Sequence, residues 1–276
     1  MASISAQGIQ QQAVPAIVEK FAADILGSLT QQQAFSSLRE ATPSFDPLGP
    51  GTHGWLVTLK KGSQIAGYLI ISAKPDGGLF LSEYGLGSEP LFDLTKLAPR
   101  DRPAVQITPM YYGPAYAEWK LTKLSSTEGA SYFAAGTGEQ LPVTDADWNK
   151  LAARPFAQTA ESVSYQDGKR ANAPLITASA FDPYSNLKWI VRENMKISNT
   201  TDFLRSMVAE KKLVFAANDQ SRSYSLALPI FGLQTWSNTT NKRADAVFVL
   251  TGTADSSRWI ELNSLLSSGK LRLFES

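Results

Sequence analysis

The sequence contains no cysteine and only one histidine, His53. Without cysteine the chain forms no disulfide, thiolate zinc site, iron–sulfur cluster or cysteine nucleophile. A single histidine does not supply a multi-histidine metal centre. His53 lies between glycines in the stretch 51–54, and no Gly-X-Ser-X-Gly motif accompanies it. We therefore expect no catalytic residue, no metal and no cofactor, and we predict that the protein is not an enzyme.

The sequence also lacks an excess of positive or negative charge and has no long apolar run. Twenty-six Lys+Arg balance 25 Asp+Glu, giving a net charge of +1, so no overall field attracts nucleic acid or an anionic membrane. No run approaches the roughly 18 apolar residues of a membrane span. The first residues, Met-Ala-Ser-Ile-Ser-Ala-Gln, lack the pattern of a signal peptide. Two interpretations fit: a cytoplasmic protein, or the mature form of an exported one. The cysteine-free, polar composition favours the second interpretation, a secreted or cell-surface protein.

Hydrophobic periodicity in the first half predicts helices followed by an antiparallel sheet. Residues 12–27 carry an apolar helical face, and a second helix is expected from Thr30, as its N-cap, to about Ala41. The turn-forming stretch 46–51 follows. The apolar period then changes to two, which predicts a three-stranded meander over 55–59, 65–73 and 79–84. A proline-studded connector from 99 to 114 leads to a hairpin over 117–124 and 131–135.

The second half repeats this mixture of helices and strands. Thr144 is expected to cap a short helix over 145–153, and the polar stretch 158–174 is the expected domain boundary or long loop. A helix from about residue 200 precedes strands at 212–217, 224–234, 246–252 and 258–262 and a closing helix at 263–268. The predicted fold class is α+β, with two domains, 1–157 and 175–276, each an antiparallel sheet packed against helices.

Aromatic residues in or beside turns are the candidates for binding. Tyr111, Tyr112 and Trp236 lie in such stretches, where a large ring either anchors a loop or contacts a partner. The other tryptophans considered lie in alternating or amphipathic segments and are expected in the core; these are Trp55, Trp119, Trp189 and Trp259. Paired carboxylates are invisible in a single sequence, so a glycoside-active enzyme or carbohydrate-binding protein stays an alternative.

Two stretches resemble propeptide modules. Residues 67–73, 75–78 and 81–85 resemble the strand, turn and strand of the prodomain of streptopain-type cysteine peptidases and its stand-alone inhibitor relatives. Residues 117–121 with 132–139 are similar to the hairpin of PepSY-type propeptide modules. No peptidase domain with a cysteine nucleophile is present, and residues 175–276 show only a faint similarity to the last strands of papain-like domains. The resemblance therefore carries over no inhibitory residue.

The resemblance implies a secreted, non-catalytic protein that acts by protein–protein contact, as an inhibitor, an escort or a surface component. Its partner would be another secreted protein, with a peptidase as the candidate that the resemblance implies. A self-assembling surface protein, associating through exposed strand edges, is a further alternative.

Overall fold

The computed structural model describes most of the chain. The described residues are 14–49, 54–74, 77–97, 105–124, 129–153, 163–164, 169–197, 199–210, 212–217, 224, 226–238, 244–253 and 256–275. Among them, no helix is both long and apolar enough to cross a membrane.

Helices and strands are mixed along the whole chain. The α-helices are α1 (Ala16–Leu29), α2 (Asp145–Ala152), α3 (Thr200–Glu210) and α4 (Leu262–Ser268), and the 3-10 helices are η1 (Gln33–Leu38), η2 (Leu94–Lys96) and η3 (Leu187–Val191). The strands of the first half are β1 (Thr42–Leu48), β2 (Gly54–Lys61), β3 (Gln64–Ala73), β4 (Leu79–Gly87), β5 (Val105–Tyr111), β6 (Ala117–Lys123), β7 (Ser131–Ala134) and β8 (Gln140–Leu141). Those of the second half are β9 (Lys169–Thr177), β10 (Leu213–Ala217), β11 (Ala227–Ile230), β12 (Gly232–Asn238), β13 (Ala244–Gly252), β14 (Ser256–Glu261) and β15 (Gly269–Leu273).

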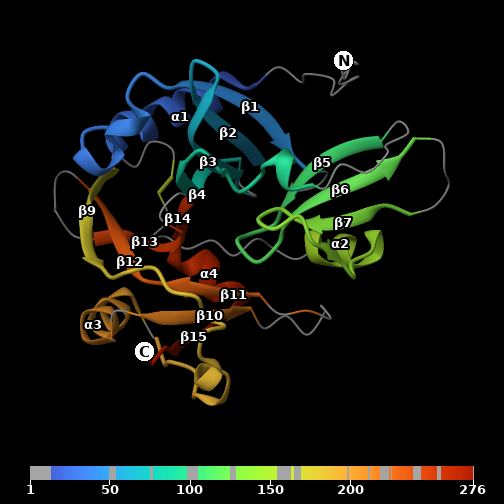
Figure 1. The fold of residues 1–276 in the computed structure, drawn as a ribbon. Helices are drawn as coiled ribbons and strands as arrows, with labels where there is room; N and C mark the ends of the chain where they lie inside the picture. The colour runs from blue at the N-terminus through green and yellow to red at the C-terminus, as the bar shows by residue number, and fades with distance from the viewer. Residues whose placement is uncertain are drawn as a thin grey trace.

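One large sheet joins the two halves of the chain. Its eight strands run in the order β1-β2-β3-β4-β14-β13-β12-β9, and β4 pairs antiparallel with β14 (Figure 1). Two smaller sheets have the orders β5-β6-β7-β8 and β11-β10-β15. The fold class is α+β, as predicted. The two predicted domains, 1–157 and 175–276, each with its own sheet, are not confirmed, because the largest sheet takes strands from both.

Both faces of the large sheet are buried. Alternate side chains of a strand point to opposite faces, and Leu69 of β3 packs with α1 and η1 in one hydrophobic cluster. Its neighbours Tyr68 and Ile70 pack on the other face against the four-stranded sheet. In the second half, Val249 of β13 joins the cluster that contains α3, α4 and the three-stranded sheet. The large sheet is therefore the middle layer of the molecule.

The predicted meander and hairpin are confirmed as β2-β3-β4 and β6-β7. The predicted cap of the 145–153 helix is also confirmed: the Thr144 hydroxyl accepts from the Asp147 N–H, and the Asp147 carboxylate accepts from the Thr144 N–H. Thr30 was expected to begin a helix but is the C-cap of α1, where its hydroxyl donates to the Leu26 carbonyl. The second predicted helix is only the short η1.

Three strands lie where turns or connectors were expected. β1 includes part of the 46–51 stretch, β5 lies inside the 99–114 connector, and β9 begins inside the 158–174 stretch. Each is at the edge of its sheet. At an edge, the N–H groups that face outward make no hydrogen bond within the sheet, so proline at such a position costs none. The local rule that proline marks a loop therefore fails at these edges.

Glycine is required where β3, β4 and β14 lie side by side. A Cβ on Gly85 would lie 2.2 Å from Cε1 of Tyr68 and 2.9 Å from the Ser257 carbonyl oxygen. By contrast, a Cβ on Gly27, inside α1, would meet nothing within 4 Å. The position of the Tyr68 ring therefore depends on the missing side chain of Gly85.

We expect Gly85→Ala to lower the free energy of unfolding by about 1–3 kcal/mol, because the added methyl group displaces the Tyr68 ring or the backbone of β14. The matched control Gly27→Ala should raise it by about 0.5–1 kcal/mol, since alanine is the better residue inside a helix. Urea unfolding of both variants checks this prediction. Equal stabilities would mean that the ring moves aside without cost.

Candidate functional site

A carboxylate with no exposure to solvent lies between the large sheet and the four-stranded sheet. Glu83 of β4 is 0% exposed. Its Oε1 accepts from Nε of Arg258 at 2.7 Å, and its Oε2 accepts from Nη2 of the same guanidinium at 3.0 Å. The Tyr68 hydroxyl donates to Oε1, and the Tyr111 hydroxyl donates to Oε2 at 3.3 Å. Both carboxylate oxygens thus hold two hydrogen bonds each.

Four strands position this group. Tyr68, Glu83 and Arg258 come from the adjacent strands β3, β4 and β14, and Tyr111 ends β5 of the facing sheet. Arg258 lies opposite Gly85 in the ladder, with Ile260 opposite Glu83, so the guanidinium reaches Glu83 diagonally. We call Tyr68, Glu83, Tyr111 and Arg258 the buried ion cluster.

The electrostatics of the buried ion cluster hold its protons in place. Burial raises the pKa of Tyr68 and Tyr111 well above the ordinary tyrosine value, and the negative charge of Glu83 raises both further. Burial alone would lower the pKa of Arg258, but Glu83, Tyr68 and Tyr111 together outweigh it and raise that pKa. A carboxylate held by a bidentate guanidinium and two phenols has no free lone pair directed at a substrate. The arrangement fits a structural ion pair better than a general acid or base.

A second buried carboxylate also has a structural task. Glu261, at the end of β14, is 1% exposed and is the N-cap of α4. Its Oε1 accepts from the Asn263 N–H at 3.1 Å, and its Oε2 accepts from the Ser264 N–H. Burial raises the pKa of Glu261, while these hydrogen bonds oppose the rise. Glu118 of β6 is likewise buried, and it accepts from the Tyr224 hydroxyl at 3.0 Å.

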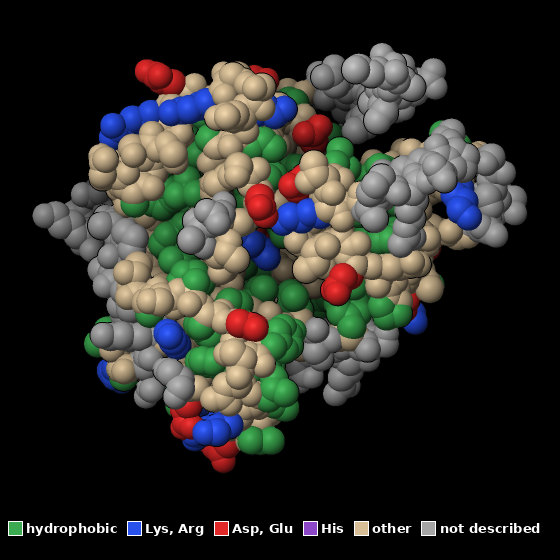
Figure 2. Space-filling view, viewed as in Figure 1, with side chains coloured by type: hydrophobic (Ala, Val, Ile, Leu, Met, Phe, Trp, Pro, Cys, Tyr) green, Lys and Arg blue, Asp and Glu red, His purple; other side chains and the backbone are tan. Residues whose placement is uncertain are grey.

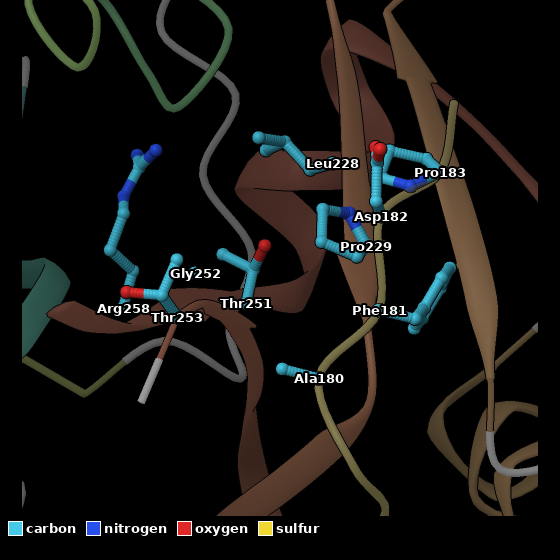
Figure 3. Close-up of a pocket in the computed structure, with 10 residues that line it drawn as sticks. All are labelled: Ala180, Phe181, Asp182, Pro183, Leu228, Pro229, Thr251, Gly252, Thr253 and Arg258. Atoms are coloured by element: carbon cyan, nitrogen blue, oxygen red, sulfur yellow. The ribbon is translucent and has the colours of Figure 1, made fainter. Parts of the chain in front are cut away.

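A pocket of about 500 Å³ lies beside the C-terminal strands. It is lined by Ala180, Phe181, Asp182, Pro183, Leu228, Pro229, Thr251, Gly252, Thr253 and Arg258. These residues come from the segment after β9, from β11, from the end of β13 with Thr253 of the following turn, and from β14. Figure 3 shows the Arg258 guanidinium pointing away from the rest of the lining. The pocket is therefore walled mainly by apolar side chains and the stem of Arg258.

Exposed apolar side chains follow directly in sequence. Four large ones lie within eight residues, at 60% exposure for Tyr184, 53% for Leu187, 49% for Ile190 and 87% for Val191. We call these four residues the apolar row. The indole N–H of Trp189 donates to the Pro183 carbonyl at 2.7 Å, which fixes η3 beside the pocket. Figure 2 shows hydrophobic side chains at the surface of the lower end of the molecule, where Figure 1 draws this amber segment.

The predicted binding residues are not brought together at the surface. Trp236 was expected in or beside a turn, and this is wrong: it lies within β12 at 1% exposure, in the core shared with Phe248 and Tyr84. Tyr111 is buried at 1% and belongs to the buried ion cluster. Tyr112 is half-buried beside Tyr116, at a ring separation of 6.5 Å. A binding role for Tyr112 stays a prediction.

The remaining tryptophans mostly follow expectation, since Trp119, Trp189 and Trp259 are buried and Trp55 is half-buried against the core. His53 lies outside the described residues. No group of three or more His, Asp or Glu side chains that could hold a metal occurs in the described part of the chain. Sequence reasoning missed the pocket and the apolar row; the spacing of Tyr184, Leu187, Ile190 and Val191 was the available signal.

Comparison with known proteins adds no family: the chain matches no protein-family model and no curated protein. The site is therefore interpreted from its own geometry.

We expect Glu83→Gln to lower the free energy of unfolding by about 3–5 kcal/mol, because it leaves the Arg258 guanidinium buried without its counter-charge. The control Glu89→Gln removes the exposed pair with Lys96, whose charged atoms are 3.5 Å apart. That change should cost less than about 1 kcal/mol. Denaturant unfolding compares the two variants, and a Glu83→Gln protein as stable as the control would contradict a structural ion pair.

A second prediction concerns pH. Asp145 accepts from Lys120 and from the Tyr132 hydroxyl, and these hydrogen bonds lower its pKa. A carboxyl group whose pKa is lower in the folded than in the unfolded state stabilises the fold at pH values above its unfolded-state pKa. This stabilisation is lost as the pH falls through the folded-state pKa. Asp145→Asn should thus destabilise by less than about 1 kcal/mol at pH 6, since the side chain is 44% exposed.

Below about pH 3 the difference between this variant and the unmodified protein should shrink toward zero. A carboxyl NMR titration of the folded protein measures the direction of the Asp145 shift. The control Asp24→Asn, in an exposed pair with Lys20, should change the stability at pH 6 by less than about 0.5 kcal/mol. A folded-state pKa above the ordinary aspartate value would contradict the prediction.

Proposed function

We propose that the protein is non-catalytic and acts by contact with another protein through the face that carries the apolar row. The observation that carries the proposal is the exposure of four large apolar side chains on one short segment. Soluble proteins rarely leave apolar side chains clustered at the surface unless a partner covers them. Within η3, the Trp189 indole donates to the Pro183 carbonyl, and the Ile190 carbonyl accepts from the Arg272 guanidinium of β15. These side chains are therefore presented by an anchored segment.

The disposition of the acidic groups supports a non-catalytic function. Glu83 and Glu261 are engaged in an ion pair and a helix cap. The described lining of the pocket contributes one carboxylate, Asp182, whose Oδ1 accepts from the Tyr184 N–H. Acid–base hydrolysis of a glycoside needs two carboxyl groups about 5 to 9.5 Å apart in one cleft. Trp236 is buried as well, so its ring is not offered to a sugar at the surface.

Contact through side chains is favoured over assembly through strand edges. Four edge strands contain proline, at Pro43 and Pro47 of β1, Pro109 of β5, Pro174 of β9 and Pro229 of β11. Proline has no N–H for a ladder and is a known protection of sheet edges. The outer side of β15 is covered where the Met195 N–H donates to the Leu271 carbonyl. These features argue against self-assembly by strand addition.

The class of partner and the location are part of the proposal. The resemblance of parts of residues 67–85 and 117–139 to propeptide modules favours an inhibitor or escort over a purely structural surface component. It also favours a secreted or cell-surface location in a Gram-positive bacterium and a secreted peptidase as the partner.

The experiment compares two folded double variants of the full chain. Leu187→Ser/Val191→Ser removes half of the apolar row, and Leu124→Ser/Val208→Ser removes two apolar side chains of 66% and 64% exposure elsewhere. Immobilised protein is incubated with the secreted proteins of the source organism, and retained proteins are identified by mass spectrometry. We expect one retained protein to be lost with the first variant and kept with the second.

The proposal would be contradicted if both variants retained the same proteins as the unmodified chain, or if no protein were retained. Turnover of a small substrate by the purified chain would contradict the non-catalytic part. Circular dichroism of both variants controls for unfolding.

A further inference from the structure

The pocket beside the apolar row has the composition of a ligand site. Five apolar residues, Ala180, Phe181, Pro183, Leu228 and Pro229, line it together with a few polar groups. Binding pockets are typically 300–1,000 Å³ in volume and mainly apolar, with a small number of polar groups that orient the ligand. At about 500 Å³, this pocket has room for one or two large side chains.

One polar group of the lining lacks a partner. Thr251 is 1% exposed, and its hydroxyl has no hydrogen-bond partner among the described residues. Figure 3 shows this hydroxyl on the side of Thr251 that faces Leu228 and Pro229, and the oxygen itself is buried. A buried hydroxyl without a partner costs about 1–3 kcal/mol. A ligand with a carbonyl group would remove that cost by accepting from Thr251, after a rotation about the Thr251 side-chain bond that leaves the backbone in place.

The charged groups around the pocket do not favour a ligand that carries a net charge. Glu83 already holds the Arg258 guanidinium. The Asp182 carboxylate lies at the rim, and the Lys212 ammonium lies 5.6 Å from the centre of the Phe181 ring. One negative and one positive group near the opening balance each other. The favoured occupant is therefore a neutral apolar group with a hydrogen-bond acceptor.

The size of the neighbouring surface decides between a whole subunit and a peptide. The apolar row exposes a few hundred Å² at most, which is within the range of a single functional patch. A stable dimer buries about 800 Å² on each partner. The row and the pocket together therefore fit a short segment better than a second copy of this chain. Pro229 also prevents the segment from extending the β11 edge as a regular strand.

We propose that the pocket receives a large apolar side chain, with its backbone carbonyl, from a short peptide segment of the partner protein, while the apolar row contacts the residues beside it. The peptide carbonyl accepts from the Thr251 hydroxyl, and the side chain packs between Ala180 and Pro229. This inference rests on the proposed function, since it assigns a recognition element to the same face.

The experiment uses the full, isotope-labelled chain and N-acetyl-phenylalaninamide as a neutral probe. NMR titration should give saturable shifts confined to the amides of 180–182, 228 and 251–253, with a dissociation constant in the millimolar range that suits so small a ligand. N-acetyl-serinamide, which has the same backbone groups, should give no saturable shift. Ala180→Phe fills the pocket from an exposed position and should abolish binding.

The matched pair Thr251→Val and Thr253→Val tests the hydroxyl. Thr251→Val should weaken probe binding roughly two- to tenfold, the value of one hydrogen bond, while the free protein unfolds no more easily. Thr253 is exposed at the rim, so Thr253→Val should leave binding unchanged. Equal binding by the two variants, or equal binding of the serine probe, would overturn the inference.

The two proposals fail separately. Absence of saturable shifts, with partner capture still dependent on Leu187 and Val191, overturns the pocket assignment and leaves the proposed function standing. Specific probe binding by a chain that retains no secreted protein supports the pocket and contradicts the proposed function.

Discussion

The buried pairing of Glu83 with Arg258 is the interaction on which the joining of the large sheet and its contact with the four-stranded sheet depend. It links neighbouring strands, β4 from the first half of the chain and β14 from the second, where they complete the eight-stranded sheet. The Tyr111 hydroxyl adds a contact from the four-stranded sheet to the same carboxylate. Charges removed from water must be paired and hydrogen-bonded, or the fold loses several kcal/mol. The cluster meets this requirement and specifies which strands become neighbours.

The buried charged groups and the exposed apolar groups also lie in different parts of the molecule. The acidic groups deepest in the molecule hold an ion pair and cap a helix, whereas the exposed apolar residues gather on the segment around η3. Prolines in four edge strands limit strand addition at the sheet margins. Side-chain contact at the pocket and the apolar row is thus the mode of binding that we propose, and it requires no reactive group.

Much of the fold followed from local rules. Alternation over 55–84 predicted β2, β3 and β4, and Thr144 with Asp147 gave a recognisable helix start. The rules failed at sheet edges and at Trp236. β5 contains Pro109, which an edge position tolerates, and the Trp236-Ser237-Asn238 stretch appeared turn-like although it continues β12 into the core. Of the predicted binding residues, Tyr112 alone retains partial exposure.

The sequence by itself determined that the chain has no cysteine chemistry and no multi-histidine site. It also determined the α+β class and the alternating pattern of the central strands. These properties depend on composition or on residues only a few positions apart. Tertiary structure alone decided that Glu83 meets Arg258, which is 175 residues away. It alone also decided that the segment after β9 and the strands β11, β13 and β14 line one pocket. Such contacts depend on the order in which strands pair, and the burial of charge that selects this order is not encoded in any single stretch of the chain.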